Sequence, residues 1–195
     1  MARLLIVGLH GFLGRGADWD PWKADFQDEI EQGEVEFWCP DLLSPHSELH
    51  PGYDFAIWAE RFIKQLQGFV ADKYLLAGYS MGGRLALHAL MQEPEMFSGA
   101  ILLSTCPFLL DASERQRRQD YDLHWAHRFL HEPWDKLMMA WNSQPVFIGE
   151  QKHPDRKESY YSRKFLAQAL ENWSLSRHLV TLKSLQDFRQ PCLLV

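Results

Sequence analysis

The chain has 195 residues, 46% of them hydrophobic, and a formal net charge of -6. That is enough apolar material for one buried core, and nothing in the sequence marks a second domain, so we expect a single domain over residues 1–195. Lysine and arginine are spread along the chain rather than gathered in a stripe. This excludes the usual signature of a nucleic-acid or anionic-membrane partner and favours a small molecule.

The cysteines and apolar runs indicate the cellular setting. Cys39, Cys106 and Cys192 are widely spaced and form no CxxC pair, so the sequence predicts neither a disulfide framework nor a metal site. The apolar run at residues 4–9 is too short for a signal sequence, and no run approaches the roughly 20 residues that span a bilayer. We expect a soluble protein of the reducing cytoplasm, and the sequence leaves its oligomeric state open.

In chain order the predicted elements alternate between strand and helix. Apolar runs at residues 4–8 and 35–39 predict two inner strands, and apolar residues at i, i+3, i+4, i+7, i+8 and i+11 predict a helix over 55–66. A strand over 73–77, a helix over about 82–91 and a strand over 100–104 follow. This alternation predicts an α/β fold with a parallel sheet, right-handed crossovers and three layers, and with the binding site at the carboxyl ends of the strands.

The second half of the chain departs from this pattern. Residues 111–141 are polar, arginine-rich and aromatic-rich, and we predict a helical lid insertion of about residues 111–158 above the strand ends. Helices are predicted again over 159–173 and 177–188, and another strand begins at residue 192.

A short motif between a predicted strand and a predicted helix carries the chemistry. Gly78-Tyr79-Ser80-Met81-Gly82 has the form G-x-S-x-G, which in this context holds a serine hydroxyl exposed on a tight turn. His10-Gly11-Phe12 follows the first predicted strand, where such folds place one backbone amide of an oxyanion hole, and the second amide would be that of Met81. The alternative is an ordinary turn serine and a packed histidine.

The motifs together resemble one family of the α/β-hydrolase fold. That family is the SHCHC synthases, which make a succinyl hydroxycyclohexadiene carboxylate in menaquinone biosynthesis. The similar segments are His10 to Gly14 with Asp18-Trp19, Gly78 to Arg84, Glu114 to Arg117, Arg128 to Leu130 with Glu132-Pro133, and Trp141 with Gln144 to Phe147.

The resemblance implies a lyase that eliminates pyruvate from a succinyl-enolpyruvyl-hydroxycyclohexene-carboxylate and uses no cofactor. In that family the serine is thought to act as a base relayed by histidine. Phe12 and Met81 would then supply the amides that stabilise an enolate-like oxygen. The substrate is a polycarboxylate, and arginine suits carboxylates best.

Six further residues are implied as substrate-binding. Arg84 lies four residues after Ser80 on the predicted helix and so projects from the same face. Arg115 and Arg163 match the family's arginines in and after the lid. Tyr79, Trp141 and Phe147 match aromatic positions that line the family's pocket, although such arginines are often solvated and such aromatics are often core residues.

One part of the family's pattern has no counterpart here. The family's catalytic acid follows the strand that begins at Cys192 and its histidine comes later still, so both would lie beyond Val195, and we expect the C-terminal part of the fold to be absent from this chain. We assign the role of base to none of the histidines present, among them His46, His124, His153 and His178. Two alternatives therefore stay open: a serine hydrolase acting on esters or carbon-carbon bonds, and a binding protein without catalysis.

Overall fold

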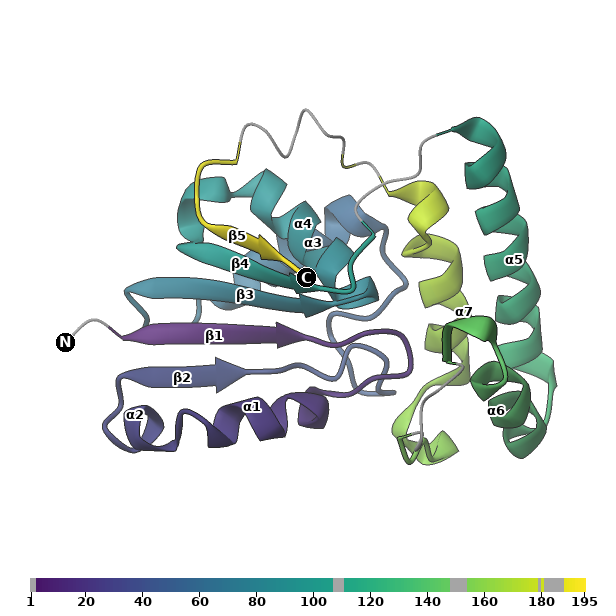
Figure 1. The fold of residues 1–195 in the computed structure, drawn as a ribbon, viewed down its shortest axis with the longest axis horizontal. Coiled ribbons are helices and arrows are strands. Elements are labelled where there is room, and N and C mark those ends of the chain that lie inside the picture. Colours follow the sequence, from purple (N-terminus) through teal and green to yellow (C-terminus); the bar gives the residue numbers. More distant parts are fainter. Residues whose placement is uncertain (1–2, 107–110, 148–153, 179, 181–187) are drawn as a thin grey trace.

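The computed structural model describes residues 3–106, 111–147, 154–178, 180 and 188–195. Five parallel strands form one sheet in the order β2-β1-β3-β4-β5. The strands are β1 (Leu4–Leu9), β2 (Val35–Trp38), β3 (Lys73–Tyr79), β4 (Gly99–Leu103) and β5 (Cys192–Leu194). All arrowheads in Figure 1 point the same way, so the carboxyl ends of the strands share one edge, as the alternating pattern predicts.

Two helices cover one face of this sheet. The helix α3 (Phe55–Leu66) has the bounds expected from its apolar spacing, and its six buried residues are those of the predicted stripe. Its first turn is capped by Asp54, whose carboxylate accepts a hydrogen bond from the amide of Ile57 at 2.9 Å. The helix α4 (Met81–Gln92) packs against α3 and β3 and is buried over most of its length. The predicted helices are confirmed here.

The sheet edge beyond β1 differs from the prediction. We expected residues 35–39 to form an inner strand, but β2 is the outer strand on this side of the described sheet and is mostly half-buried. Two short helices that the sequence did not predict, α1 (Asp20–Ala24) and α2 (Gln27–Glu31), lie along it (Figure 1). Each has five residues, too few to show a helical period.

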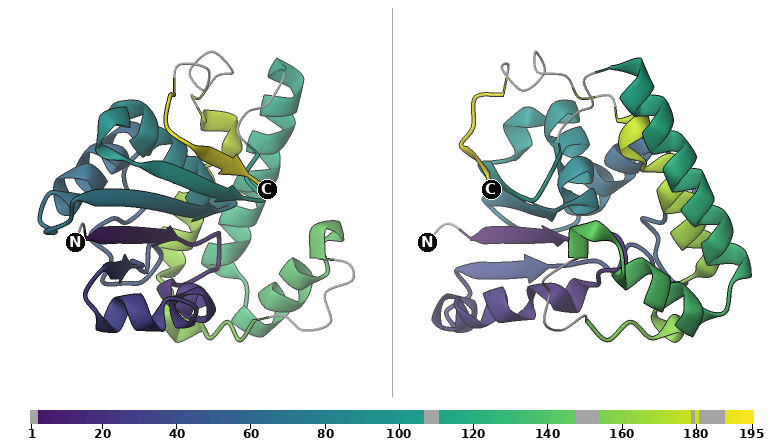
Figure 2. Two further views of the ribbon diagram at one scale, coloured as in Figure 1. Left: turned by 60° about the vertical axis from the view of Figure 1, so that its left-hand side comes forward. Right: turned by 45° about the vertical axis from the view of Figure 1, so that its right-hand side comes forward.

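The remaining helices lie beyond the carboxyl ends of the strands. Figure 2 shows from two further sides that α5 (Ala112–His131), α6 (Trp134–Asn142) and α7 (Arg163–Asn172) form a separate group there. Most of the helix predicted over 177–188 lies outside the described residues. Short 3₁₀ helices occur at Gly16–Trp19, Pro94–Met96, Pro145–Phe147, Glu158–Tyr160 and Leu175–Arg177. None of the helices described is both long and apolar enough to span a bilayer.

Candidate active site

Ser80 occupies a strained turn between β3 and α4. Its backbone has φ 52° and ψ -107°, a conformation that costs an L-residue free energy and that persists only when its surroundings impose it. Its amide donates a hydrogen bond to the carbonyl of Leu103 on the neighbouring strand at 2.9 Å. The turn therefore holds the serine at the carboxyl edge of the sheet.

The glycines of the motif allow this turn because neighbouring backbone leaves no room for a side chain. A Cβ on Gly82 would lie 2.0 Å from the carbonyl oxygen of Leu9, and one on Gly78 would lie 2.5 Å from the Cα of Gly83. Both distances are far below van der Waals contact. The G-x-S-x-G pattern thus reflects the close approach of α4 to β1 and β3.

Backbone strain gathers around one cavity. Among the described residues only Leu13, Ser80 and Ser104 combine a positive φ with a side chain, at 57°, 52° and 48°. All three line the same pocket of about 630 Å³. Strained residues of this kind concentrate at functional sites, so their position supports this pocket as the active site.

The two expected oxyanion amides belong to residues that line this pocket beside Ser80. Phe12 follows β1 and Met81 is the first residue of α4, and both line the cavity. The first amides of a helix have no intrahelical acceptor, so the Met81 amide is available to a ligand by its position. A negative oxygen near Ser80 would also meet the positive end of the α4 dipole.

His10 has a structural position rather than a catalytic one. Its ring is buried, with Nδ1 2.8 Å from the carbonyl oxygen of Gly11 and Nε2 accepting from the amide of Leu42 at 2.9 Å. These contacts require the neutral tautomer that donates through Nδ1, and burial lowers the pKa of the ring. His10 therefore ties the loop carrying Phe12 to the loop after β2.

Arg84 is where its spacing predicts, one turn after Ser80 on the wall of the pocket. It is only 7% exposed, and one guanidinium nitrogen donates to the carbonyl of Trp173 at 3.0 Å. Burial, followed by repulsion from Arg118, lowers its pKa to about 10, so the side chain stays charged at neutral pH. Its Nε has no hydrogen-bond partner among the described residues.

Two further arginines line the same pocket, and sequence reasoning did not select either. Arg118 comes from α5 and Arg156 from the segment before α7, where Arg156 donates to the side chain of Asn142 at 2.6 Å. A helical-spacing argument could have found Arg118. It lies four residues before Asp122, on the face that buries Trp125 and Phe129.

Arg115 and Arg163, which the resemblance implies as substrate-binding, are not among the described residues that line this pocket. Arg115 donates to the carbonyls of Ser176 and His178 and so joins α5 to the segment after α7. Arg163 donates to the carbonyls of Phe129 and Glu132 at the end of α5. Carbonyls at a helix C-terminus attract a cation, which accounts for the position of Arg163 without a ligand.

The three aromatic residues named from the sequence all line the pocket. Tyr79 is partly exposed beside Ser80, and Trp141 and Phe147 come from α6 and the turn after it. The Trp141 ring lies 4.9 Å from that of Phe12. The pocket therefore combines an apolar wall with three cationic side chains, and two acids, Asp18 and Asp122, also line it.

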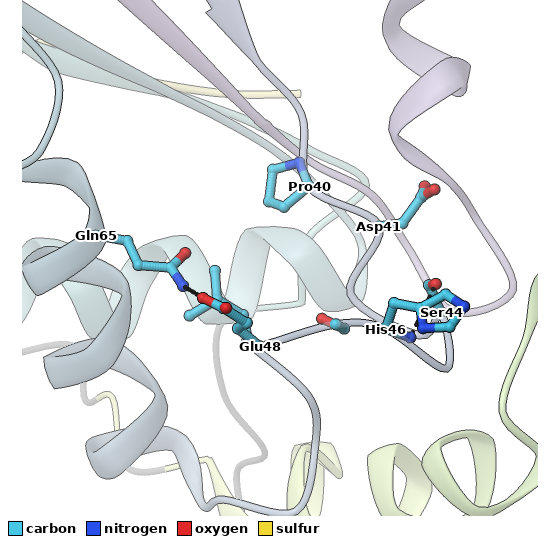
Figure 3. Close-up of a pocket in the computed structure, with 8 residues that line it drawn as sticks. Pro40, Asp41, Ser44, His46, Glu48 and Gln65 are labelled. Carbon is cyan, nitrogen blue, oxygen red and sulfur yellow. Dashed lines mark hydrogen bonds between the residues drawn. The ribbon is translucent and has the colours of Figure 1, made fainter.

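Of the histidines discussed from the sequence, those that the structure describes do not line the Ser80 pocket. His178 is buried against His88, with ring nitrogens 3.0 Å apart, His124 is on α5, and His153 lies outside the described residues. His46 lines a second pocket of about 240 Å³ after β2 (Figure 3). There Glu48 accepts from Gln65 at 2.9 Å and Asp41 accepts from the amide of Gly16 at 2.6 Å, so these acids stabilise their own loops.

Comparison with known proteins assigns the chain to a family. Residues 6–195 match the sequence profile of the alpha/beta hydrolase family, so the chain belongs to it. The structure of MenH from S. aureus superimposes with a TM-score of 0.86 and 20% identity, covering all of this chain and 75% of that one. At that identity the likeness shows the fold alone.

Sequence relatives narrow the family. A 2-succinyl-6-hydroxy-2,4-cyclohexadiene-1-carboxylate (SHCHC) synthase of Yersinia pestis is 30% identical over 95% of this chain and 68% of its own length. One of Enterobacter is 33% identical over 75% of this chain. Within the alpha/beta hydrolases, the chain belongs with the SHCHC synthases. It spans only 55% of the Enterobacter protein's length in that match, about half of the relative.

Proposed function

We propose that this chain is part of an SHCHC synthase, a lyase that eliminates pyruvate from a succinyl-enolpyruvyl-hydroxycyclohexene-carboxylate in menaquinone biosynthesis. One observation carries the proposal: the strained Ser80 lines a cavity whose walls also present Arg84, Arg118 and Arg156. A cavity with three arginines suits a ligand with several carboxylates, because guanidinium groups bind carboxylates through paired hydrogen bonds. Its volume suits a small molecule.

The geometry around Ser80 fits an elimination that begins with proton removal. A base takes the proton beside the succinyl carbonyl, and the electron pair moves to the carbonyl oxygen as an enolate. The amides of Phe12 and Met81 would stabilise that oxygen. When the electron pair returns from the oxygen, a second double bond forms in the ring as the existing ring double bond shifts. The bond between the ring and the enolpyruvyl oxygen then breaks, and the leaving enolate takes up a proton on carbon to become pyruvate.

Ser80 needs an activating partner for this role. A serine hydroxyl is a weak base until a neighbouring group accepts its proton. Among the described residues its hydroxyl has no hydrogen-bond partner, and the buried His10 is held by backbone groups on both ring nitrogens. In the SHCHC synthases, the family that the chain resembles, the catalytic acid and histidine follow the strand that corresponds to the one beginning at Cys192. We propose that these two groups complete the site in the whole protein.

We further propose that residues 111–158 act as a lid over the substrate. The aromatic rings of Trp125, Phe129 and Trp141 on α5 and α6 pack against one another, and Phe12 packs against Phe129 and Trp141. This cluster would join the lid to the loop that carries an oxyanion amide. Cys39, Cys106 and Cys192 are free thiols, and we propose that the protein works in the reducing cytoplasm.

The decisive experiment measures pyruvate release by the full-length gene product with the authentic precursor. We expect turnover that Ser80→Ala reduces by about 10³-fold or more, as for removal of a group on which the chemistry depends. Ser98→Ala, a serine in a loop outside the pocket, serves as the control. The absence of pyruvate release together with rapid, Ser80-dependent hydrolysis of a nitrophenyl ester would overturn the lyase in favour of a serine hydrolase.

A further inference from the structure

A buried acid forms part of the wall of the arginine-lined pocket. Asp122, on α5, is 2% exposed and lines the cavity. Its Oδ2 accepts hydrogen bonds from Nε of Arg118 at 2.8 Å and from the hydroxyl of Ser174 at 2.6 Å. A carboxylate is costly to bury, and these two strong donors offset part of that cost. An acid in the wall of a site for anions requires an explanation.

The second of these hydrogen bonds leads to Arg84, which is buried. Ser174 directly follows Trp173, whose carbonyl accepts from the guanidinium of Arg84 at 3.0 Å. The Ser174 hydroxyl also accepts from the amide of Ser176 at 3.0 Å, which fixes the turn after α7. The Asp122 carboxylate therefore binds Arg118 directly. Through Ser174 it also holds the adjacent carbonyl of Trp173, which orients Arg84.

The two guanidinium groups are close enough to affect each other. Arg118 disfavours the charged form of Arg84, and Asp122 favours it, although burial is the largest influence on the pKa of Arg84. Without Asp122 the two cations would repel each other across the pocket when no ligand is bound. The acid thus keeps two like charges at a fixed separation before a substrate arrives.

From this geometry we infer that Asp122 is a positioning residue. It fixes the spacing between the guanidinium groups of Arg84 and Arg118, so that they meet two carboxylates of one ligand at once. This inference rests on the proposed function, because it takes the two arginines as carboxylate-binding. A pre-formed pair of cations binds a dicarboxylate better than two mobile cations do, because less side-chain freedom is lost on binding. A monocarboxylate can bind only one of the two cations at a time, so it gains no affinity from their fixed spacing.

Two substitutions separate positioning from charge. Asp122→Asn and Asp122→Ala both remove the negative charge, but the asparagine keeps an oxygen that accepts from Arg118 and Ser174. We expect calorimetric titration of the full-length gene product to give a succinate Kd about tenfold higher for Asp122→Ala than for Asp122→Asn, equivalent to about one lost hydrogen-bond anchor. The Kd for acetate should differ less between the two. Equal succinate Kd values would overturn the inference, since only the charge would then matter.

A matched ion pair on the same helix serves as the control. Arg128 and Glu132 are also four residues apart, with Nε 2.8 Å from the carboxylate, but neither lines the pocket. Glu132→Gln and Glu132→Ala should therefore have the same succinate Kd as the wild type. A change of the same size at Glu132 would show that any broken ion pair on α5 has this effect, and it would also overturn the inference.

Three further variants test the inference if Asp122→Ala does not fold, and they separate it from the proposed function. If Asp122→Ala does not fold, Ser174→Ala removes one hydrogen bond and leaves the carboxylate, and we expect its succinate Kd to rise about threefold. An unchanged Kd there would contradict the connection to Arg84. Arg84→Gln and Arg118→Gln test the proposed function separately. If neither Arg84→Gln nor Arg118→Gln weakens succinate binding, the proposed carboxylate site is wrong. If both weaken it but Asp122→Ala and Asp122→Asn have equal succinate Kd values, only the positioning role of Asp122 is wrong.

Discussion

At the residue scale, burial makes the guanidinium group of Arg84 a stronger binding group for a carboxylate than a surface arginine is. A surface arginine can rotate away and pair with water, but Arg84 is held by Trp173 and buried beside the strained serine. A carboxylate that reaches it meets a cation with little competing water, where charge-assisted hydrogen bonds are strong. Arg84 should therefore contribute more to substrate binding and turnover than an exposed arginine of the same chain does.

This comparison yields a test within the same chain. Arg84→Ala should lower kcat/KM for pyruvate release by roughly 30- to 150-fold, equivalent to about 2–3 kcal/mol for a lost hydrogen bond to a charged group. Arg117→Ala should change kcat/KM less than about twofold. Within the described part of the chain Arg117 donates only to Ser113 on its own helix, and it does not line the pocket. Equal losses in steady-state kinetics would show that proximity to Ser80 is not what matters.

The site could be predicted from the sequence only in part, and the arginines show why. The spacing from Ser80 to Arg84 is local, so helix geometry alone places the second residue near the first. Arg115, Arg117 and Arg118 are close in sequence but lie at different angles on α5, and only Arg118 lines the pocket. Helical spacing identifies the buried face of α5, which carries Asp122, Trp125 and Phe129, and Arg118 lies on that face. Spacing does not show that this face lines the pocket, because that depends on the tertiary structure.

At the element scale, period and length decided which elements could be predicted. The 12 residues of α3 carry a full apolar stripe, whereas α1 and α2 have five residues each and no period to detect. The sequence predicts β2 to be an inner strand because Val35 and Phe37 are apolar. In the structure Phe37 lies at the sheet edge, where its ring packs against those of Trp22 and Phe26. An apolar run shows burial and not the order of strands.

The helix α5 yields a prediction that separates its two faces. Phe129 has no exposed surface and contacts the rings of Phe12 and Trp141, whereas the adjacent Leu130 is 47% exposed. Phe129→Ala should lower the free energy of unfolding by about 3–5 kcal/mol, the usual cost of deleting a buried aromatic ring. Leu130→Ala should change it by less than about 0.5 kcal/mol in the same urea titration. Similar values would mean that α5 is not anchored through this face.

At the scale of the whole molecule, a buried histidine pair makes the free energy of unfolding depend on pH. His88 on α4 stacks on Phe55 of α3 with ring centroids 4.2 Å apart, and it shares a hydrogen bond with His178. The pair therefore joins both helices of the sheet face to the segment after α7. Burial, followed by the charge of Arg84, lowers the pKa of His88 from 6.5 to about 4, with Asp54 acting in the opposite direction.

The direction of the pH effect follows from this lowered pKa. The folded protein keeps His88 neutral in a range where the unfolded chain binds a proton, so the stabilisation is complete above pH 6.5 and is lost as the pH falls toward 4. At about 1.4 kcal/mol per pH unit, the loss should reach about 3 kcal/mol. The buried His10, whose pKa is also lowered by burial, should add to the same trend.

Urea unfolding at a series of pH values tests the contribution of His88. His88→Gln cannot titrate but can still form a hydrogen bond with His178, so its free energy of unfolding should fall less steeply between pH 6.5 and 4 than that of the wild type. The slope is the informative quantity, because His88→Gln also changes packing at every pH. A slope equal to that of the wild type would mean that His88 is protonated as readily in the folded protein as in the unfolded chain.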